Sequence, residues 1–511
     1  MLNLLRSIPL LGVVPLFASA VLGDTCSEVS LNTDIEVTSP LDVSYLNEQK
    51  DYWSASCSAL KPSCIIFPRS AAEVSAVIKI LNTNNEKFAI KSGGHSPNNY
   101  FSSVDGGPLI STQRLDHLNL DPTTGVADLG PGNRLDEIGA KLQGTGWTFV
   151  GGRIGNTGSG GLMLGGGLSY MSAQYGWSAS SVIEYELVLP NGTVVYPSST
   201  AHPSLWRALK GGGNNFGVVT NYKLQTYRQG LVYGGNLVYL RTPETDRKIL
   251  RAVRDFTEFN TDDRAAVIVT AERAQVNLVD TWILFLFYDG PTPPADTFKN
   301  FTSNGIPGLI TNTARTRTYA DLMALSNWVV LRGFQVMIAT ETVPIPSSSS
   351  SSSSSALSDE ILWQGIHSHW RNISTTTLAV PGIVASIAYQ PFPRRIAAAA
   401  RAKSPDLIDA DPDADKLIIE LNYAFLNPGD YAAMDGKMQA TYGGIRERVL
   451  AWQAEGKLPG DVYLPVFMNY GYFRQDYFGR LKSGSRRLAR EVAEAVDPLG
   501  VFRGRTGGWK P

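Results

Sequence analysis

The chain has 511 residues, and 45 Lys and Arg balance 46 Asp and Glu, so that the formal net charge is −1. A near-neutral chain without a basic excess argues against nucleic-acid binding and against a polybasic membrane-surface protein. The hydrophobic residues make up 43% of the chain, as in ordinary globular proteins, and the length predicts more than one domain.

The N-terminus has the pattern of a secretory signal peptide over residues 1–20. Arg6 supplies the positive charge, Ile8 to Phe17 is mostly apolar, and Ala18-Ser19-Ala20 fits a cleavage site, with cleavage between residues 20 and 23. A membrane anchor is the alternative, but the apolar run is shorter than the roughly 20 residues that a spanning helix needs. The expected location is therefore outside the cell or within the secretory pathway.

Secretion permits disulfide bonds, and the chain has three cysteines, Cys26, Cys57 and Cys64. Three cysteines allow one pair and leave one thiol free. Cys26–Cys64 is favoured because it ties the mature N-terminus to the first domain, while Cys57–Cys64 stays open. N-glycosylation is possible at three sequons, those of Asn191, Asn300 and Asn372.

Residues 60–230 alternate short apolar runs with helical patterns. Ser70 and Glu73 form a capping box, and an apolar stripe that begins at Val74 predicts a helix behind it. Phe88 to Lys91 predicts a strand that ends at a glycine pair, and a second helical stripe begins at Leu135. This first region is predicted to be α+β, built around a sheet.

Residues 235–455 carry longer strand patterns. A helical stripe runs from Ile249 to Phe256. Strands are predicted at Val267 to Thr270, Trp282 to Tyr288, Ile383 to Tyr389 and Leu417 to Tyr423. The pattern indicates a second domain with an antiparallel sheet covered by helices.

Two further segments complete the chain. Nine serines at 347–355 bury nothing, so we expect a flexible loop there, with a lid over a pocket as the alternative. The C-terminal segment, 456–511, contains a helix with Leu488, Val492 and Val496 on one side, which ends at Asp497-Pro498.

Glycine clusters dominate the first region. Lys91 to Ser96 reads Lys-Ser-Gly-Gly-His-Ser after a predicted strand, and nine glycines fall between 151 and 167, interrupted by apolar residues that a linker would not contain. A third cluster lies at 211–217. Glycines let a backbone approach a ligand closely, so three such turns predict a large, flat ligand. Neither the dinucleotide fingerprint nor a phosphate-loop lysine motif is present.

These motifs resemble the FAD-linked oxidases of the vanillyl-alcohol-oxidase superfamily, and in particular the fungal berberine-bridge-enzyme-like group. The resemblance covers nearly the whole mature chain. It is carried, in order, by Pro62 to Pro68, Lys91 to Ser96, Gly151 to Ser169, Tyr175-Gly176-Trp177, Leu205 to Gly217, Asn469-Tyr470, Gln475-Asp476, Asp497 to Phe502 and Gly507-Gly508.

The resemblance implies a PCMH-type FAD-binding domain of two subdomains at 60–230, a substrate domain at 235–455, and a C-terminal segment that returns to the FAD domain. It also implies that FAD is bonded covalently to His95. A second bond from a cysteine is excluded, because Ile154 stands at that position and no cysteine follows Cys64. The implied cofactor-binding residues are His95, Ser92, Gly93, Gly94, Ser96, Gly155, Asn156, Thr157, Gly158, Gly160, Gly161, Gly165, Val219 and Asn469.

The expected reaction moves a hydride from a small substrate to FAD and on to oxygen, with a protein base taking a proton. The resemblance places Tyr470 near the flavin. Glu420 lies on a predicted strand between apolar neighbours, a setting that raises the pKa of a carboxylate, while Tyr423 points to the opposite face. The alternatives are that Tyr470 only packs on the flavin and that Glu420 faces solvent.

Other candidates are weaker. Asp476 has less support as a base, and His367 and His369 are predicted at the surface. No metal site is expected, because His367-Ser368-His369 alone is too small a ligand set.

The predicted function is oxidation of a small metabolite in specialised biosynthesis. Pro97 supports this, since oligosaccharide-oxidising members of the family tend to carry a tyrosine there. The alternatives are an extracellular carbohydrate or alcohol oxidase, a flavoprotein cyclase, and a flavin-binding protein without catalysis. No nucleic-acid or membrane partner is expected.

Overall fold

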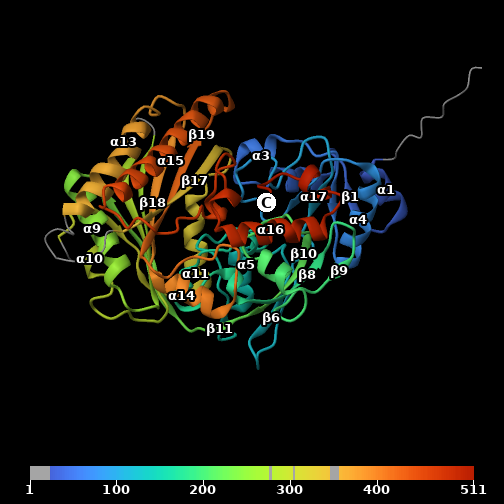
Figure 1. Cartoon of the computed structure of the whole chain (residues 1–511), viewed down its shortest axis with the longest axis horizontal. Helices are drawn as coiled ribbons and strands as arrows, with labels where there is room; N and C mark the ends of the chain where they lie inside the picture. Colours follow the sequence, from blue (N-terminus) through green and yellow to red (C-terminus); the bar gives the residue numbers. More distant parts are fainter. Residues whose placement is uncertain (1–23, 275–278, 303–304, 346–355) are drawn as a thin grey trace, which may run out of the picture.

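The computed structural model describes residues 24–274, 279–302, 305–345 and 356–511, and it consists of two regions that lie side by side (Figure 1). The predicted signal peptide and the serine tract at 347–355 lie outside the described residues. No helix within the described ranges is long and apolar enough to cross a membrane.

The first region opens with a four-stranded sheet in the order β1-β2-β4-β3. Its strands are β1 (Glu36–Thr38), β2 (Ile65–Phe67), β3 (Ala89–Lys91) and β4 (Leu109–Ser111). The helix α4 (Ala71–Asn84) buries the predicted stripe from Val74 to Leu81 near this sheet. The Ser70 Oγ accepts the N–H of Glu73 at 3.2 Å, which confirms Ser70 as the N-cap, but the Glu73 carboxylate accepts the N–H of Arg69 and so does not complete the predicted capping box. At the edge, α1 (Thr25–Asn32) is tied to β2 by the Cys26–Cys64 disulfide, and Cys57 is a buried free thiol.

A second sheet of the same region has the order β5-β6-β10-β8-β9. Its strands are β5 (Leu118–Leu120), β6 (Val126–Leu129), β8 (Val182–Val188), β9 (Val194–Val195) and β10 (Val218–Gln225). The short helices beside it are α5 (Leu135–Leu142), α6 (Ser159–Leu164), α7 (Ser172–Tyr175) and α8 (Pro203–Ala208). The long glycine loop between α5 and α7 thus lies where the two sheets of this region meet.

The second region contains an eight-stranded sheet in which every described pair is antiparallel. Its strands run in the order β15-β12-β14-β13-β18-β19-β17, and β16 also pairs with β12. The strands are β12 (Val232–Leu240), β13 (Ala265–Ala274), β14 (Val279–Tyr288), β15 (Leu309–Asn312), β16 (Arg315–Arg317), β17 (Gln335–Pro344), β18 (Val384–Phe392) and β19 (Lys416–Phe425). Three of the four predicted strands fall within β13, β14 and β19, and the fourth, Ile383 to Tyr389, begins one residue before β18.

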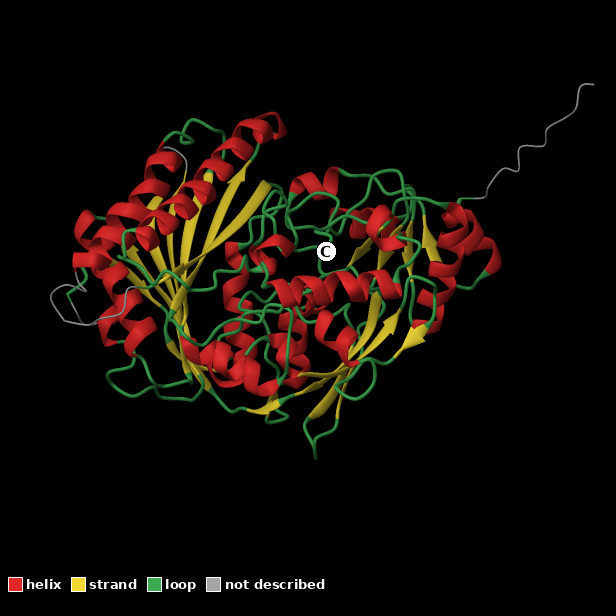
Figure 2. Ribbon diagram, viewed as in Figure 1, coloured by secondary structure: helices red, strands yellow, loops and turns green. Residues whose placement is uncertain are grey.

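The two faces of this sheet have different neighbours (Figure 2). One face packs against four helices, α9 (Pro243–Phe259), η4 (Asp359–His367), α13 (Ser368–Thr375) and α15 (Tyr431–Ala454), and forms the largest core. The other face looks toward the first region, where Ile283 and Phe285 share a core with Leu162 and Met163. Because residues alternate along each strand, one set of side chains builds the core and the other faces the first region.

The C-terminal segment crosses back to the first region, where α16 (Ser483–Val496) lies across the centre of Figure 1. Val492 is buried and Leu488 packs beside it in the core that includes Trp206 of α8. The following helix, α17 (Val501–Arg505), inserts Phe502 edge-on against Phe88, with ring centroids 5.3 Å apart.

The prediction that His367 lies at the surface is wrong. Its side chain is fully buried at the end of η4, stacks on Trp282 with a centroid distance of 5.0 Å, and has Nδ1 3.1 Å from the Tyr389 hydroxyl oxygen. The helix turns His367 and the adjacent Ile366 toward the sheet, so burial there follows from packing rather than residue type. His369, by contrast, is partly exposed and lies 3.1 Å from the Ala440 carbonyl oxygen.

Candidate active site

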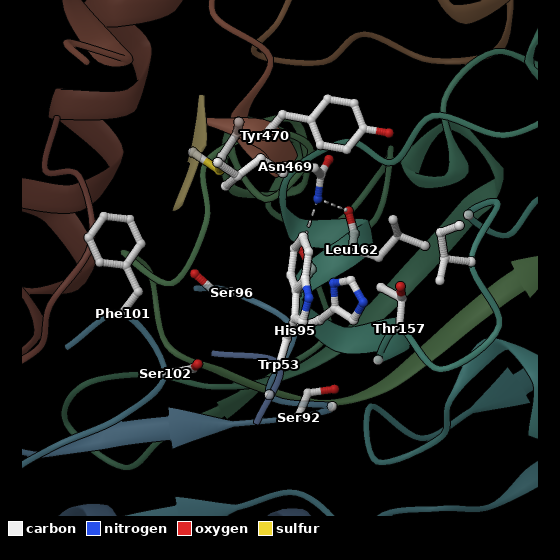
Figure 3. Close-up of a pocket in the computed structure, with 18 of the residues that line it drawn as sticks. Trp53, Ser92, His95, Ser96, Phe101, Ser102, Thr157, Leu162, Asn469 and Tyr470 are labelled. Atoms are coloured by element: carbon white, nitrogen blue, oxygen red, sulfur yellow. Dashed lines mark hydrogen bonds between the residues drawn. The ribbon is translucent and has the colours of Figure 1, made fainter. Parts of the chain in front are cut away.

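A cavity of about 530 Å³ lies between the glycine loops of the first region and the large sheet. The loops contribute residues 92–96, 152–154, 157–158 and 213–219, and the C-terminal segment contributes 467–470. The opposite wall comes from strands β13, β18 and β19. Segments that are far apart in the chain therefore line the same cavity (Figure 3).

His95 lies in this cavity immediately after β3. Its ring packs beside Trp53 with centroids 4.6 Å apart, and Figure 3 shows the two rings together. Burial, together with the positive charge of Arg134, lowers the pKa of His95 to about 4, so the imidazole is neutral at physiological pH. Its buried Nε2 has no hydrogen-bond partner within the described part of the chain. A neutral imidazole with an unpartnered nitrogen suits bond formation with a bound cofactor.

Two glycine loops touch backbone to backbone beside His95. A Cβ on Gly93 would lie 2.4 Å from the Gly158 nitrogen, and a Cβ on Gly158 would lie 2.3 Å from the Gly93 nitrogen. Any side chain at either position would drive the loops apart. The Ser92 hydroxyl holds the same junction by donating to the Pro131 carbonyl oxygen at 2.6 Å.

Gly158→Ala is therefore expected to lower both stability and flavin content. The new methyl has no space, because its neighbours are backbone atoms, and overpacking of this kind costs about 1–3 kcal/mol of unfolding free energy. Urea unfolding and the ratio of flavin absorbance to protein absorbance measure the two effects. Gly230→Ala is the matched control, since a Cβ there meets nothing within 4 Å. A Gly158→Ala protein that behaves like the control would contradict the close backbone contact between Gly93 and Gly158, called here the Gly93–Gly158 crossing.

Asn469 connects the C-terminal segment to the long glycine loop. Its Nδ2 donates to the Leu162 carbonyl oxygen at 3.1 Å, and its Oδ1 accepts the Gly167 N–H at 3.0 Å. A Cβ on Gly165 would lie 2.5 Å from that Nδ2. The side chain thus fixes the end of α6 at the cavity (Figure 3).

The structure brings most of the predicted cofactor residues to the cavity wall. Those that line it are Ser92, Gly93, Gly94, His95, Ser96, Thr157, Gly158, Gly160, Gly161, Val219 and Asn469. Gly155, Asn156 and Gly165 do not line it and lie behind the wall. Asn327, for example, accepts the Asn156 N–H at 2.8 Å and so holds the loop from outside.

A polar cluster of four side chains lies on the sheet side of the cavity. Gln390 donates to Glu420 Oε2 at 2.7 Å, and the Tyr470 hydroxyl donates to Gln390 Oε1 at 3.3 Å. The buried Arg153 guanidinium donates to both Gln390 and Tyr470. Residues from the glycine loop, β18, β19 and the C-terminal segment therefore form one hydrogen-bonded network.

The two predicted bases differ in their pKa values. Burial raises the pKa of Glu420, and the nearby Arg153 charge limits the rise. Burial raises the pKa of Tyr470 to about 12 despite the same guanidinium. At neutral pH Tyr470 is therefore a proton donor, and Glu420 is the better proton acceptor.

The other candidates lie elsewhere. Tyr423 points to the helix-covered face, where its hydroxyl lies 2.9 Å from Thr441 Oγ1, as strand alternation predicts. Asp476 is exposed and accepts the Gly479 N–H at 2.9 Å within a turn.

Sequence reasoning missed several residues of the site. Trp53 and Phe101 line the cavity from the first region, and Gln390 and Glu272 come from the sheet. Only Glu272 had a usable signal, a charged residue within a strand of β-branched and small apolar residues. The aromatic residues and Gln390 had none, because their roles depend on partners distant in the chain.

A family model described as FAD binding domain matches residues 62–196. An uncharacterized FAD-linked oxidoreductase of Arthroderma benhamiae is 38% identical over 478 residues, which cover 93% of this chain and 92% of the relative. An FAD-dependent monooxygenase of Fusarium proliferatum is 28% identical over 461 residues, 88% of this chain and 85% of that protein.

Two solved structures share the fold. Physcomitrella patens BBE-like 1 superposes with a TM-score of 0.72 at 15% identity, covering 94% of this chain and 97% of that one. Glucooligosaccharide oxidase from Acremonium strictum, described as carrying 6-S-cysteinyl, 8α-N1-histidyl FAD, superposes with a TM-score of 0.70 at 16% identity, covering 94% and 98%.

The glycine loops around the cavity fall mainly within or just beyond the matched FAD domain, and the relationship to the Arthroderma protein extends over nearly the whole chain. The chain is an FAD-dependent oxidoreductase that belongs to the FAD-linked oxidoreductase family, and it has the fold of BBE-like 1 and of glucooligosaccharide oxidase.

Proposed function

We propose that this protein is a secreted oxidase that carries FAD on His95 alone and oxidises a small hydroxylated metabolite with molecular oxygen. The observation that carries the proposal is the neutral His95 ring, whose Nε2 has no hydrogen-bond partner among the described residues, in the same cavity as the Glu420 network. His95 anchors the cofactor, and Glu420 accepts a proton.

The residues of the first region fit FAD. The Gly93–Gly158 crossing and the unpartnered His95 Nε2 leave backbone and one ring nitrogen available to a flat ligand. A single covalent bond follows from the sequence, since Ile154 replaces the cysteine that would form a second one and Cys57 is buried outside the cavity lining. Bound FAD would supply the hydride acceptor, and its reoxidation by molecular oxygen would yield hydrogen peroxide.

The protein's own contribution is proton transfer and positioning. The Glu420 carboxylate takes the proton from the substrate hydroxyl as the adjoining carbon is oxidised, which prevents charge from accumulating. Gln390 holds the carboxylate by a 2.7 Å hydrogen bond. Arg153 holds Gln390 and Tyr470 in turn, and its charge keeps the pKa of Glu420 from rising further.

Acid precipitation of the purified protein tests the covalent link. We expect the yellow colour to stay with the pellet and to map to the peptide that contains His95. Flavin that washes entirely into the supernatant would contradict the proposal. A peroxide assay with a panel of alcohols, amines and sugars then tests whether molecular oxygen is the electron acceptor.

The same preparation tests secretion. N-terminal sequencing after expression in a fungal host should find a mature protein that starts between residues 21 and 24. Enzymatic deglycosylation should lower its mass, since Asn191 and Asn372 are exposed and Asn300 is partly exposed. An intact Met1 and an unchanged mass would place the protein inside the cell.

A monooxygenase is the second candidate, because the Fusarium relative carries that name. An oxidase reduces molecular oxygen to hydrogen peroxide, whereas a monooxygenase inserts one oxygen atom into the product. Incorporation of label from ¹⁸O₂ into the product, without stoichiometric peroxide, would favour the monooxygenase.

A further inference from the structure

The wall of the cavity opposite the glycine loops carries a row of polar side chains across three strands. Glu272 on β13 pairs with Ser386 on β18, and Ser386 pairs with Asn422 on β19. All three line the cavity. Neighbouring strands are about 4.8 Å apart, so the row presents a carboxylate, a hydroxyl and an amide at regular spacing.

These three side chains have no hydrogen-bonding partner in the part of the chain that the structure describes. Within the described residues, no hydrogen bond or ion pair joins the side chain of Glu272, Ser386 or Asn422 to another group. Each is partly accessible, and each faces the cavity. Polar groups that line a cavity without protein partners are available to a ligand.

Charge distinguishes Glu272 from the rest of the row. The only charged side chains among the described residues of the cavity wall are Arg153, Glu272 and Glu420. Burial raises the pKa of both glutamates, but the Arg153 charge limits the rise only for Glu420, and no charged group limits it for Glu272 among the described residues. Among the described residues, therefore, no cation of the cavity wall compensates the Glu272 carboxylate.

The register places Glu272 away from the proposed base. Ala388 pairs with both Thr270 and Glu420, so Glu420 lies two strands and two residues from Glu272. The corresponding Cα separation is roughly 12 Å, from strand spacing and rise. A small substrate that reaches Glu420 with its oxidised carbon extends toward Glu272 with its other end.

We propose that Glu272 binds a protonated amine at the end of the substrate distant from Glu420, while Ser386 and Asn422 contact polar groups between the two ends. The substrate class is thus an amine-bearing alcohol. This inference rests on the proposed function for the position of the reacting carbon. A partly desolvated carboxylate gains more from a cation than from a neutral group, because the cation restores the interaction that burial removes.

The test measures binding to the flavin-loaded protein, without turnover. Under anaerobic conditions, 4-(aminomethyl)benzyl alcohol is titrated while the flavin absorption spectrum is recorded, and 1,4-benzenedimethanol serves as the neutral probe of the same shape. Benzylamine and benzyl alcohol form a second, shorter pair. The variants are Glu272→Gln, which removes the charge and keeps the shape, and Glu244→Gln, a matched change at an exposed position of α9.

We expect the wild-type protein and Glu244→Gln to bind each amine more tightly than its neutral counterpart. Glu272→Gln should weaken amine binding by roughly 10- to 100-fold and leave neutral probes unaffected, as expected for loss of a charge-assisted hydrogen bond. Equal binding of amine and alcohol by wild type would overturn the proposal. So would tighter binding of the neutral probe that is lost in Glu272→Gln, or no spectral change with any amine up to its solubility limit.

The outcome is separable from that of the proposed function. Covalent attachment to His95 and peroxide release are measured independently, and the binding spectra need only bound flavin. A protein with the covalent link and normal peroxide release but no preference for amines would retain the proposed function and lose this inference.

Discussion

His95→Ala is expected to yield a protein whose flavin is released completely by acid. The variant has no imidazole nitrogen to bond to the cofactor, although the Gly93–Gly158 crossing that cradles it remains. Turnover should fall on the order of 100-fold, since a cofactor without its anchor is misplaced in a step that depends on geometry. Precipitation, absorption spectra of pellet and supernatant, and steady-state peroxide release measure these effects.

His117→Ala is the matched control, because that imidazole pairs with Asn221 at 2.9 Å and does not line the cavity. It should retain the bound flavin. Attachment of FAD to apoprotein should also proceed equally at neutral and mildly acidic pH, because the pKa of His95 is lowered to about 4 and the ring stays neutral above it. Flavin that remains bonded in His95→Ala would place the link at another residue.

Glu420→Gln is expected to lower the rate of flavin reduction by about 10²- to 10⁴-fold, the usual contribution of a general base. The substitution keeps the size of the side chain and its contact with Gln390 but cannot accept a proton. Anaerobic stopped-flow mixing with the first substrate that bleaches the flavin measures the effect. Substrate binding should change little, so the substitution should lower kcat and leave KM nearly unchanged.

The dependence of activity on pH tests whether the Glu420 carboxylate is the base. Burial raises the pKa of Glu420, so activity in wild type should be lost as pH falls through a value above that of an ordinary glutamate. The acid limb should be absent from the residual activity of Glu420→Gln. Tyr470→Phe distinguishes the two candidate bases. If Glu420 accepts the proton, Tyr470→Phe should lower the rate of flavin reduction less than Glu420→Gln does. A larger loss in Tyr470→Phe would assign the base to Tyr470.

Local patterns predicted the elements of both regions. The stripe from Val74 to Leu81 became α4, and Leu417 to Tyr423 became part of β19. Alternation along β19 also separated Glu420 from Tyr423, since side-chain direction in a strand depends only on position. The motif around His95 was recognisable because a glycine pair permits backbone conformations and close approaches that other residues do not allow.

Burial of individual side chains was less predictable. His367 was expected at the surface, yet it stacks on Trp282 beneath η4. Its sequence neighbours do not reveal which helix face meets the sheet. That is decided by packing against Trp282 and Tyr389, which lie on two other elements of the chain.

The sequence by itself determined the family motifs, the lack of a cysteine after Cys64 and the class of fold, and it predicted His95 as the residue that bonds to the flavin. Only the tertiary structure decided which side chains meet. Arg153, Gln390, Glu420 and Tyr470 come from a loop, two strands and the C-terminal segment, and Glu272 faces the same cavity from a third strand. Periodicity and glycine content act between near neighbours in the chain, whereas a site is formed by strand register and by the packing of one region on another, which no local pattern encodes.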